Sequence, residues 1–104
     1  MSEYKVAYNA CYGGFGLSEE ASVYLNTHWG CNIDPDYGYI DEDIIPRHHK
    51  GLIEAIELFG EKASGFCAKL KVATISTPMY RVDEYDGYES VETPYSYNWV
   101  IIHE

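Results

Sequence analysis

Apolar residues occupy every second position in two stretches of the chain, as they do in strands with one buried face. Tyr4, Val6 and Tyr8 alternate in this way and predict a first strand over residues 4–10. Residues 68–72 also alternate, with lysines at the polar positions. Both stretches are therefore expected to lie in one sheet.

The C-terminal third carries the pattern of a hairpin. Residues 80–85 and 88–93 flank Asp86-Gly87, a pair that tolerates the positive φ angles of a two-residue turn. Residues 99–103 are apolar enough to predict one more strand after the hairpin.

Two other stretches have helical spacing. Ser18 is suited to be the N-cap of a helix to about His28, since acidic residues occupy the first turn that follows. A second helix is indicated by an apolar face, an opposite acidic face and a glycine at its end. The residues of this second pattern are Leu52, Ile53, Ile56 and Phe59, then Glu54 and Glu57, then Gly60.

These elements predict one α+β domain over residues 1–104. Its expected architecture has two layers, with two helices packed on one face of a largely antiparallel sheet of four to five strands. Residues 30–46 contain two glycines, two prolines and five acids, which favours a long surface loop.

The charge of the chain limits its partners. Seventeen Asp and Glu against seven Lys and Arg give a formal net charge of −10, which repels nucleic-acid phosphates and favours a basic protein surface. No stretch has the length of a membrane span or the pattern of a signal peptide. Three cysteines without a CxxC pair indicate a reducing compartment, so we expect a cytoplasmic protein.

Tyrosines are mixed with acids in two parts of the chain. Tyrosine gives a large contact area at low entropic cost, and carboxylates pair with Lys and Arg on a partner. We therefore expect these residues to form an interaction surface, although strand alternation could turn some of the tyrosines inward. The candidates are Tyr37, Tyr39, Asp41, Glu42, Asp43, Asp83, Glu84, Tyr85, Asp86, Tyr88 and Glu89.

Arg47, His48, His49 and Lys50 form a dense basic cluster at the expected start of the second helix. Together with free N–H groups at that helix N-terminus they could bind a small anion, such as a nucleotide phosphate. The alternative is that they neutralise the acids at 41–43.

The sequence gives little support for catalysis or for metal binding. An enzyme built on Cys11 with His48 or His49 would need contacts that only the fold could supply. The spacing of His28, Cys31 and the later histidines fits zinc poorly, and residues 34–45 lack the glycine and glutamate of a calcium loop. We therefore predict neither a metal nor a cofactor.

Residues 8–21 (YNACYGGFGLSEEA) and 84–94 (EYDGYESVETP) resemble segments of an uncharacterised family of small proteins from tailed phages and prophages. The resemblance also covers Pro46-Arg47-His48 and the following helix. His49 stands where these relatives often have an acid. The resemblance implies a viral origin, and hence a location in the host cytoplasm, but no activity.

The sequence as a whole favours a small acidic interaction protein that binds a basic site on a host or viral protein. A nucleotide-binding protein that uses Arg47 and His48 is the second hypothesis, and a Cys/His enzyme is the third. An exposed strand edge could also support a homodimer.

Overall fold

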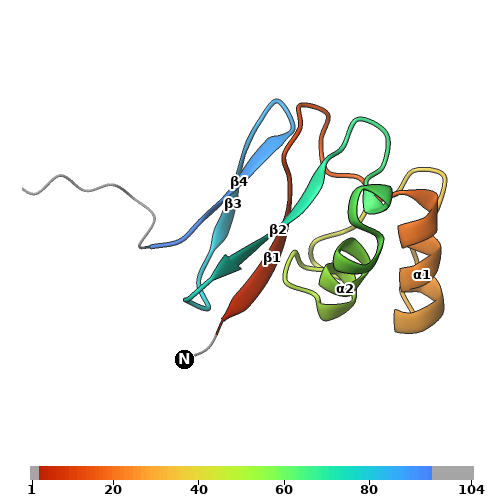
Figure 1. Cartoon of the computed structure of the whole chain (residues 1–104), viewed down its shortest axis with the longest axis horizontal. Helices are drawn as coiled ribbons and strands as arrows, with labels where there is room; N and C mark the ends of the chain where they lie inside the picture. The colour runs from red at the N-terminus through yellow and green to blue at the C-terminus, as the bar shows by residue number, and fades with distance from the viewer. Residues whose placement is uncertain (1–2, 95–104) are drawn as a thin grey trace, which may run out of the picture.

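Strand β1 (Tyr4–Asn9) is the central element of the computed structural model, which describes residues 3–94. It pairs antiparallel with β2 (Leu70–Ile75), so that Tyr4 lies opposite Ile75 and Asn9 opposite Leu70. Strands β3 (Arg81–Tyr85) and β4 (Tyr88–Glu92) form an antiparallel hairpin. This hairpin lies beside β1, on the side of the β1–β2 pair away from the helices (Figure 1).

The two helices follow the sequence prediction closely. Helix α1 (Glu19–Trp29) begins after Ser18, whose Oγ accepts a hydrogen bond from the Ala21 N–H at 3.1 Å, and ends at Gly30. Helix α2 (Lys50–Phe59) ends at Gly60 and continues into a short 3₁₀ helix, η1 (Gly60–Ala63). Neither α1 nor α2, the longest helices of residues 3–94, has the length and apolar character needed to cross a bilayer.

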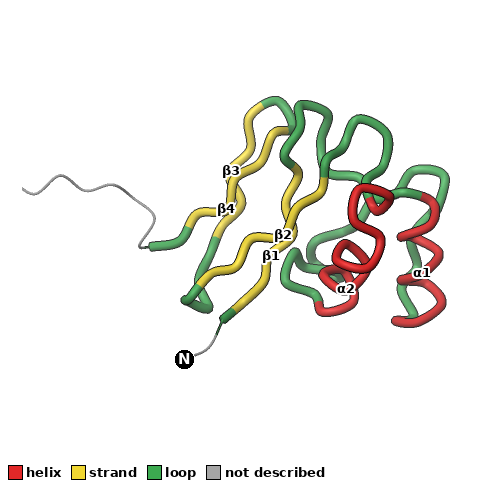
Figure 2. The backbone as a smooth tube through the Cα atoms, in the orientation of Figure 1, coloured by secondary structure: helices red, strands yellow, loops and turns green. Residues whose placement is uncertain are grey.

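The core lies between the helices and the β1–β2 pair. Helix α2 packs against both strands, and α1 packs mainly against α2 and η1, so the helices lie on one side of the strands (Figure 2). Burial of these apolar side chains provides the main driving force for the fold. The buried leucines and isoleucines of this core are Leu17, Leu25, Ile33, Ile40, Ile45, Leu52, Ile53, Ile56 and Leu70.

The predicted α+β class is confirmed, but the sheet differs in detail. Instead of one sheet of four to five strands, residues 3–94 form two two-stranded sheets. The reason lies at the edge of β1 that faces β4, where the main-chain N–H of Asn9 bonds to the carboxylate of Glu89 instead of a β4 carbonyl. The strand predicted at 99–103 lies outside the described residues.

The long loop before α2 is held in place by buried isoleucines and by a side-chain clamp. Ile33, Ile40 and Ile45 are each at most 6% exposed. The Asn26 side chain bonds to both main-chain groups of Ile33, at 2.8 Å each. The loop has no regular secondary structure beyond turns, as predicted, yet it packs as part of the core.

The hairpin turn packs directly on the loop between β1 and α1. Asp86 and Gly87 have φ angles of 50° and 85°, as a two-residue turn of this kind requires. A Cβ on Gly87 would lie 2.3 Å from the main-chain N of Gly14. Gly14 has a similar φ of 88°, but a Cβ there would have open space around it.

This pair of glycines allows a matched test. Gly14→Ala should lower the free energy of unfolding by about 1 kcal/mol, the usual cost of a positive φ without glycine. Gly87→Ala should cost roughly 2 kcal/mol more, because it also forces backbone apart. Urea unfolding of both variants measures the difference, and equal losses would show that the close approach does not exist.

Candidate functional site

Asn9 joins three segments at the end of β1. It is fully buried, and its Nδ2 donates to the carbonyls of Cys11 at 2.7 Å and Gly87 at 2.8 Å. Its Oδ1 accepts from the N–H of Lys69 at 2.8 Å. Its own N–H donates to Glu89 Oε1 at 2.8 Å. This one side chain therefore ties the hairpin turn to β1 and to the residue that precedes β2.

Arg47 and Glu89 form a buried ion pair beside Asn9. The guanidinium contacts both carboxylate oxygens of Glu89, at 2.5 and 2.8 Å, and each residue is at most 7% exposed. Two parallel bonds of this kind are among the stronger charge-assisted contacts. The Arg47 carbonyl accepts from the N–H of Ala7 at 2.8 Å, so main chain and side chain both hold Arg47 against β1.

Two further contacts complete the surroundings of the guanidinium. Its Cζ lies 3.9 Å from the centroid of the Phe15 ring, a cation–π contact. Its Nη2 lies 2.7 Å from Glu42 Oε1, at the mouth of the site. One guanidinium thus faces two carboxylates and an aromatic ring, while its Nε has no hydrogen-bond partner among residues 3–94.

Above this ion pair lies a cleft of about 480 Å³. The loop before α2 forms one wall, the β3–β4 hairpin forms the other, and the Gly14-Phe15 loop closes one side. Five carboxylates but a single guanidinium line it, so its interior is strongly acidic. The acids are Asp41, Glu42, Asp43, Glu84 and Glu89.

The structure brings together the two predicted interaction segments, although they are about 40 residues apart in sequence. Tyr39 lines the cleft and is 74% exposed, Tyr37 is 80% exposed and Tyr85 is 74% exposed. Tyr88 is 42% exposed and packs on Tyr12 with ring centroids 5.2 Å apart. These phenol rings are therefore not turned into the core.

Two of the predicted acids lie outside the cleft, and a third lines the cleft but is buried. Asp83 and Asp86 are exposed but do not line the cleft. The prediction that Glu89 belongs to an exposed interaction surface is wrong. Its side chain is only 6% exposed, because the pleat of β4 points it inward together with Val91. Its carboxylate is already neutralised by Arg47.

The four basic residues expected to bind an anion do not converge on one position. Arg47 points to Glu89, and His48 Nδ1 lies 2.6 Å from the Tyr80 hydroxyl. His49 Nδ1 accepts from the N–H groups of Gly51 and Leu52, so this imidazole itself caps α2. Lys50 is exposed. Two of the N–H groups that an anion would use at this terminus are thus already bonded to the imidazole.

The cysteines and histidines are also distributed over separate sites. Cys11 and Cys31 are half-buried, Cys67 is exposed, and burial raises the pKa of the Cys31 thiol. His48 and His49 contact Tyr80 and the start of α2 rather than a thiol. Within residues 3–94 no three His, Cys, Asp or Glu side chains are grouped as metal ligands would be.

Sequence reasoning did not find Asn9 or the pairing of Arg47 with Glu89. One signal was present: alternation in the hairpin places Glu89 on the same strand face as Val91, which is unusual for a carboxylate without a partner. No local pattern relates it to Arg47, which is 42 residues away.

The chain was compared with models of protein families, with curated proteins and with solved structures, and none of them matches it.

Loss of the buried pair is expected to destabilise the protein strongly. Glu89→Gln removes one of the two negative charges that face the Arg47 guanidinium. Breaking one side of a buried ion pair lowers the free energy of unfolding by about 3 kcal/mol or more. Glu57→Gln removes the partner of Lys5 in an exposed pair, so its cost should stay below about 1 kcal/mol. Urea unfolding compares the two, and similar small losses would mean that the pair does not hold the site together.

Tyr80 provides a test of the electrostatics beside the cleft. Burial, and next the negative charge of Glu42, raise the pKa of Tyr80. A raised pKa means that the neutral phenol stabilises the fold. This contribution is fully present below the pKa of the unfolded chain, about 10, and is lost as pH rises through the higher pKa of the folded state. Glu42→Gln should lower the pKa of Tyr80, whereas Asp43→Asn should leave it nearly unchanged. A ¹³C NMR titration of the tyrosines, assigned with Tyr80→Phe, measures both, and equal effects would contradict the arrangement.

Proposed function

We propose that this protein binds a basic site on another protein through the acidic cleft and the exposed tyrosines of the two segments that form it. The observation that carries the proposal is the meeting of the 37–43 loop and the 83–89 hairpin at one cleft lined by carboxylates. A Lys or Arg side chain of the partner is the group that such a cleft would accept.

The internal ion pair leaves the outer acids of the cleft available. Arg47 compensates Glu89 and contacts Glu42. Asp41, Asp43 and Glu84 line the same cleft but form no ion pair with a basic side chain of residues 3–94. Carboxylates held close together without a counter-ion repel each other, and a partner's cation relieves that repulsion.

The exposed tyrosines of these two segments suit a protein partner, and one of them, Tyr39, lines the cleft. Tyr37, Tyr39 and Tyr85 are each at least 74% exposed and flank the acids in sequence. Tyrosine and arginine are enriched among the residues that dominate binding energy at interfaces. The net charge of −10 disfavours nucleic acid as the partner, because phosphates would meet a field of the same sign.

The resemblance to small phage and prophage proteins would make the partner a host or viral protein in the host cytoplasm. That origin stays a prediction, as does inhibition of a nucleic-acid-handling factor as the outcome of binding. Such factors present basic grooves, to which acids mixed with aromatic rings are complementary.

Binding should depend on the acids of the cleft rather than on total charge. In the test, a triple variant, Asp41→Asn with Asp43→Asn and Glu84→Gln, is compared with Glu19→Gln, Glu20→Gln and Glu61→Gln, exposed positions away from the cleft. Both variants remove three negative charges. The cleft variant should bind an oligo-arginine peptide, or a captured partner, about tenfold more weakly at low salt.

Titration calorimetry at two salt concentrations provides the measurement. The affinity of the natural protein should fall with added salt, and the cleft variant should show a smaller fall. Equal weakening by both triple variants would show that only overall charge matters. Binding that is insensitive to salt would contradict the proposal outright.

A further inference from the structure

The floor of the acidic cleft already binds one guanidinium. Arg47, Glu89 and Phe15 all line the cleft. The two Nη atoms of Arg47 contact the two carboxylate oxygens of Glu89, and its Cζ lies 3.9 Å from the centroid of the Phe15 ring. A carboxylate that accepts two N–H bonds at once and an aromatic ring against the guanidinium are contacts that suit arginine better than lysine.

The outer part of the cleft offers the same two kinds of contact. Tyr39 lines the cleft and is 74% exposed, so its ring is open to a partner. Asp41, Asp43 and Glu84 line the cleft as well, and none of them has an ion-pair partner among residues 3–94. The outer part therefore has a ring and carboxylates, like the floor, but no bound cation of this chain.

Arg47 is not free to serve these outer groups. Its guanidinium is held by Glu89 and Phe15 and also contacts Glu42, and its carbonyl accepts the N–H of Ala7. Within residues 3–94 no other basic side chain lines the cleft. A cation for the outer carboxylates therefore has to come from a partner.

Two of the outer carboxylates are oriented before any partner binds. Oδ1 of Asp41 accepts the N–H of Asp43 at 2.9 Å, and Oε1 of Glu84 accepts the N–H of Gly87 at 2.7 Å. Asp41 belongs to one wall of the cleft and Glu84 to the other. A guanidinium has five N–H donors in one plane, whereas an ammonium is a compact, strongly hydrated charge with three donors. Fixed acceptors on two walls favour the wider, planar group.

We propose that the cleft selects arginine over lysine on its basic partner, and that the ring of Tyr39 sets this preference. The inference rests on the proposed function and adds the kind of basic side chain that the cleft accepts. A guanidinium of the partner lies against the Tyr39 ring and bonds to the outer carboxylates, as Arg47 does with Phe15 and Glu89. A lysine keeps the charge attraction but loses the stacking and the planar set of hydrogen bonds.

Peptides of six arginines and of six lysines test this preference, because they have equal length and equal charge. Titration calorimetry at low salt should show about fivefold tighter binding of hexaarginine to the natural protein. Tyr39→Leu removes the ring and should lower the affinity for hexaarginine to that for hexalysine. The affinity for hexalysine should change by less than about twofold. Since Tyr39 is mostly exposed, the variant should fold, and circular dichroism checks this.

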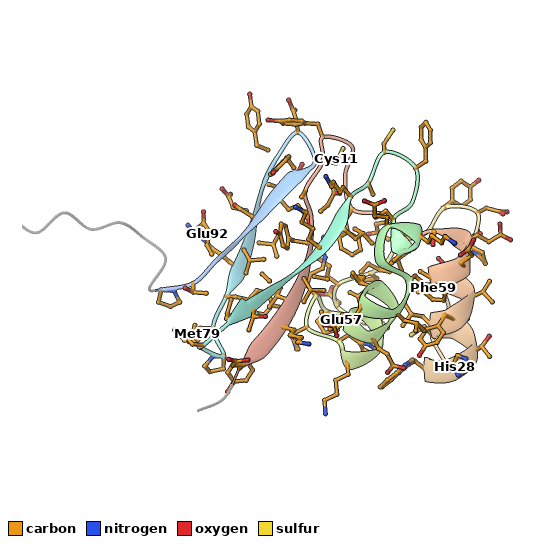
Figure 3. All side chains as sticks on the ribbon, viewed as in Figure 1. Cys11, His28, Glu57, Phe59, Met79 and Glu92 are labelled. Atoms are coloured by element: carbon orange, nitrogen blue, oxygen red, sulfur yellow. The ribbon has the colours of Figure 1, made fainter. Side chains whose placement is uncertain are left out.

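Two further variants separate the ring of Tyr39 from other causes. Tyr39→Phe keeps an aromatic face and should keep the preference, which excludes the hydroxyl as its source. Tyr12→Leu removes a similarly exposed ring, 68% exposed, outside the cleft. Tyr12 follows Cys11, which lies beside the hairpin turn (Figure 3). The ratio of the two peptide affinities should be unchanged in Tyr12→Leu.

Proton NMR of hexaarginine shows directly whether the side chain stacks on the ring. The δ-methylene protons of a stacked arginine should move upfield when the natural protein or Tyr39→Phe is added, because they enter the ring current. Tyr39→Leu should abolish most of this shift. An equal shift with Tyr39→Leu would contradict the stacking.

The same titrations distinguish a failure of the arginine preference from a failure of the proposed function. Equal, salt-sensitive affinities for the two peptides, both weakened by Asp41→Asn with Asp43→Asn and Glu84→Gln, would overturn the preference and leave the proposed function in place. A preference that persists in Tyr39→Leu would overturn the assignment to Tyr39. If neither peptide binds at low salt, the proposed function is wrong, and the preference falls with it.

Discussion

The bidentate contact between Arg47 and Glu89 is the constraint on which the arrangement of this fold depends. A charge removed from water needs an opposite charge and hydrogen bonds in good geometry, otherwise burial costs several kcal/mol. Here the guanidinium and carboxylate satisfy each other, and the carboxylate also accepts the N–H of Asn9. The loop before α2, strand β1 and the hairpin therefore have one relative placement that satisfies all three groups.

Local patterns predicted the local structure well. The Ser18 cap, the apolar face from Leu52 to Phe59 and the Asp86-Gly87 turn each depend on residues within one element, and all three are present. The division into two sheets was not predictable in this way, because it depends on Glu89 replacing a carbonyl beside Asn9. Likewise, His49 was expected to attract an anion, but its ring nitrogen occupies the helix terminus itself.

Residues 47–50 separate two surfaces of opposite character. Arg47 forms the floor of the acidic cleft, whereas His48 and Lys50 border a larger, mainly apolar groove of about 1100 Å³ between the start of β1, helix α2 and Tyr80. Tyr80 belongs to the groove, yet the charges of Glu42 and Arg47 act on its pKa in opposite directions. A cation bound near Glu42 would thus change the pKa of Tyr80, whose hydroxyl bonds to His48. The charges at the cleft therefore act on a side chain that lines the other hollow.

The attachment of the hairpin to β1 has a consequence for how the molecule opens. The backbone ladder of β3 and β4 is complete within the hairpin, and its connection to β1 runs through the side chains of Asn9, Arg47 and Glu89. If these bonds and the packing of Gly87 and Tyr88 on the loop after β1 were lost first, the hairpin would leave as one unit, because its own ladder does not need β1. We expect its amides to exchange at a lower free energy than that of global unfolding.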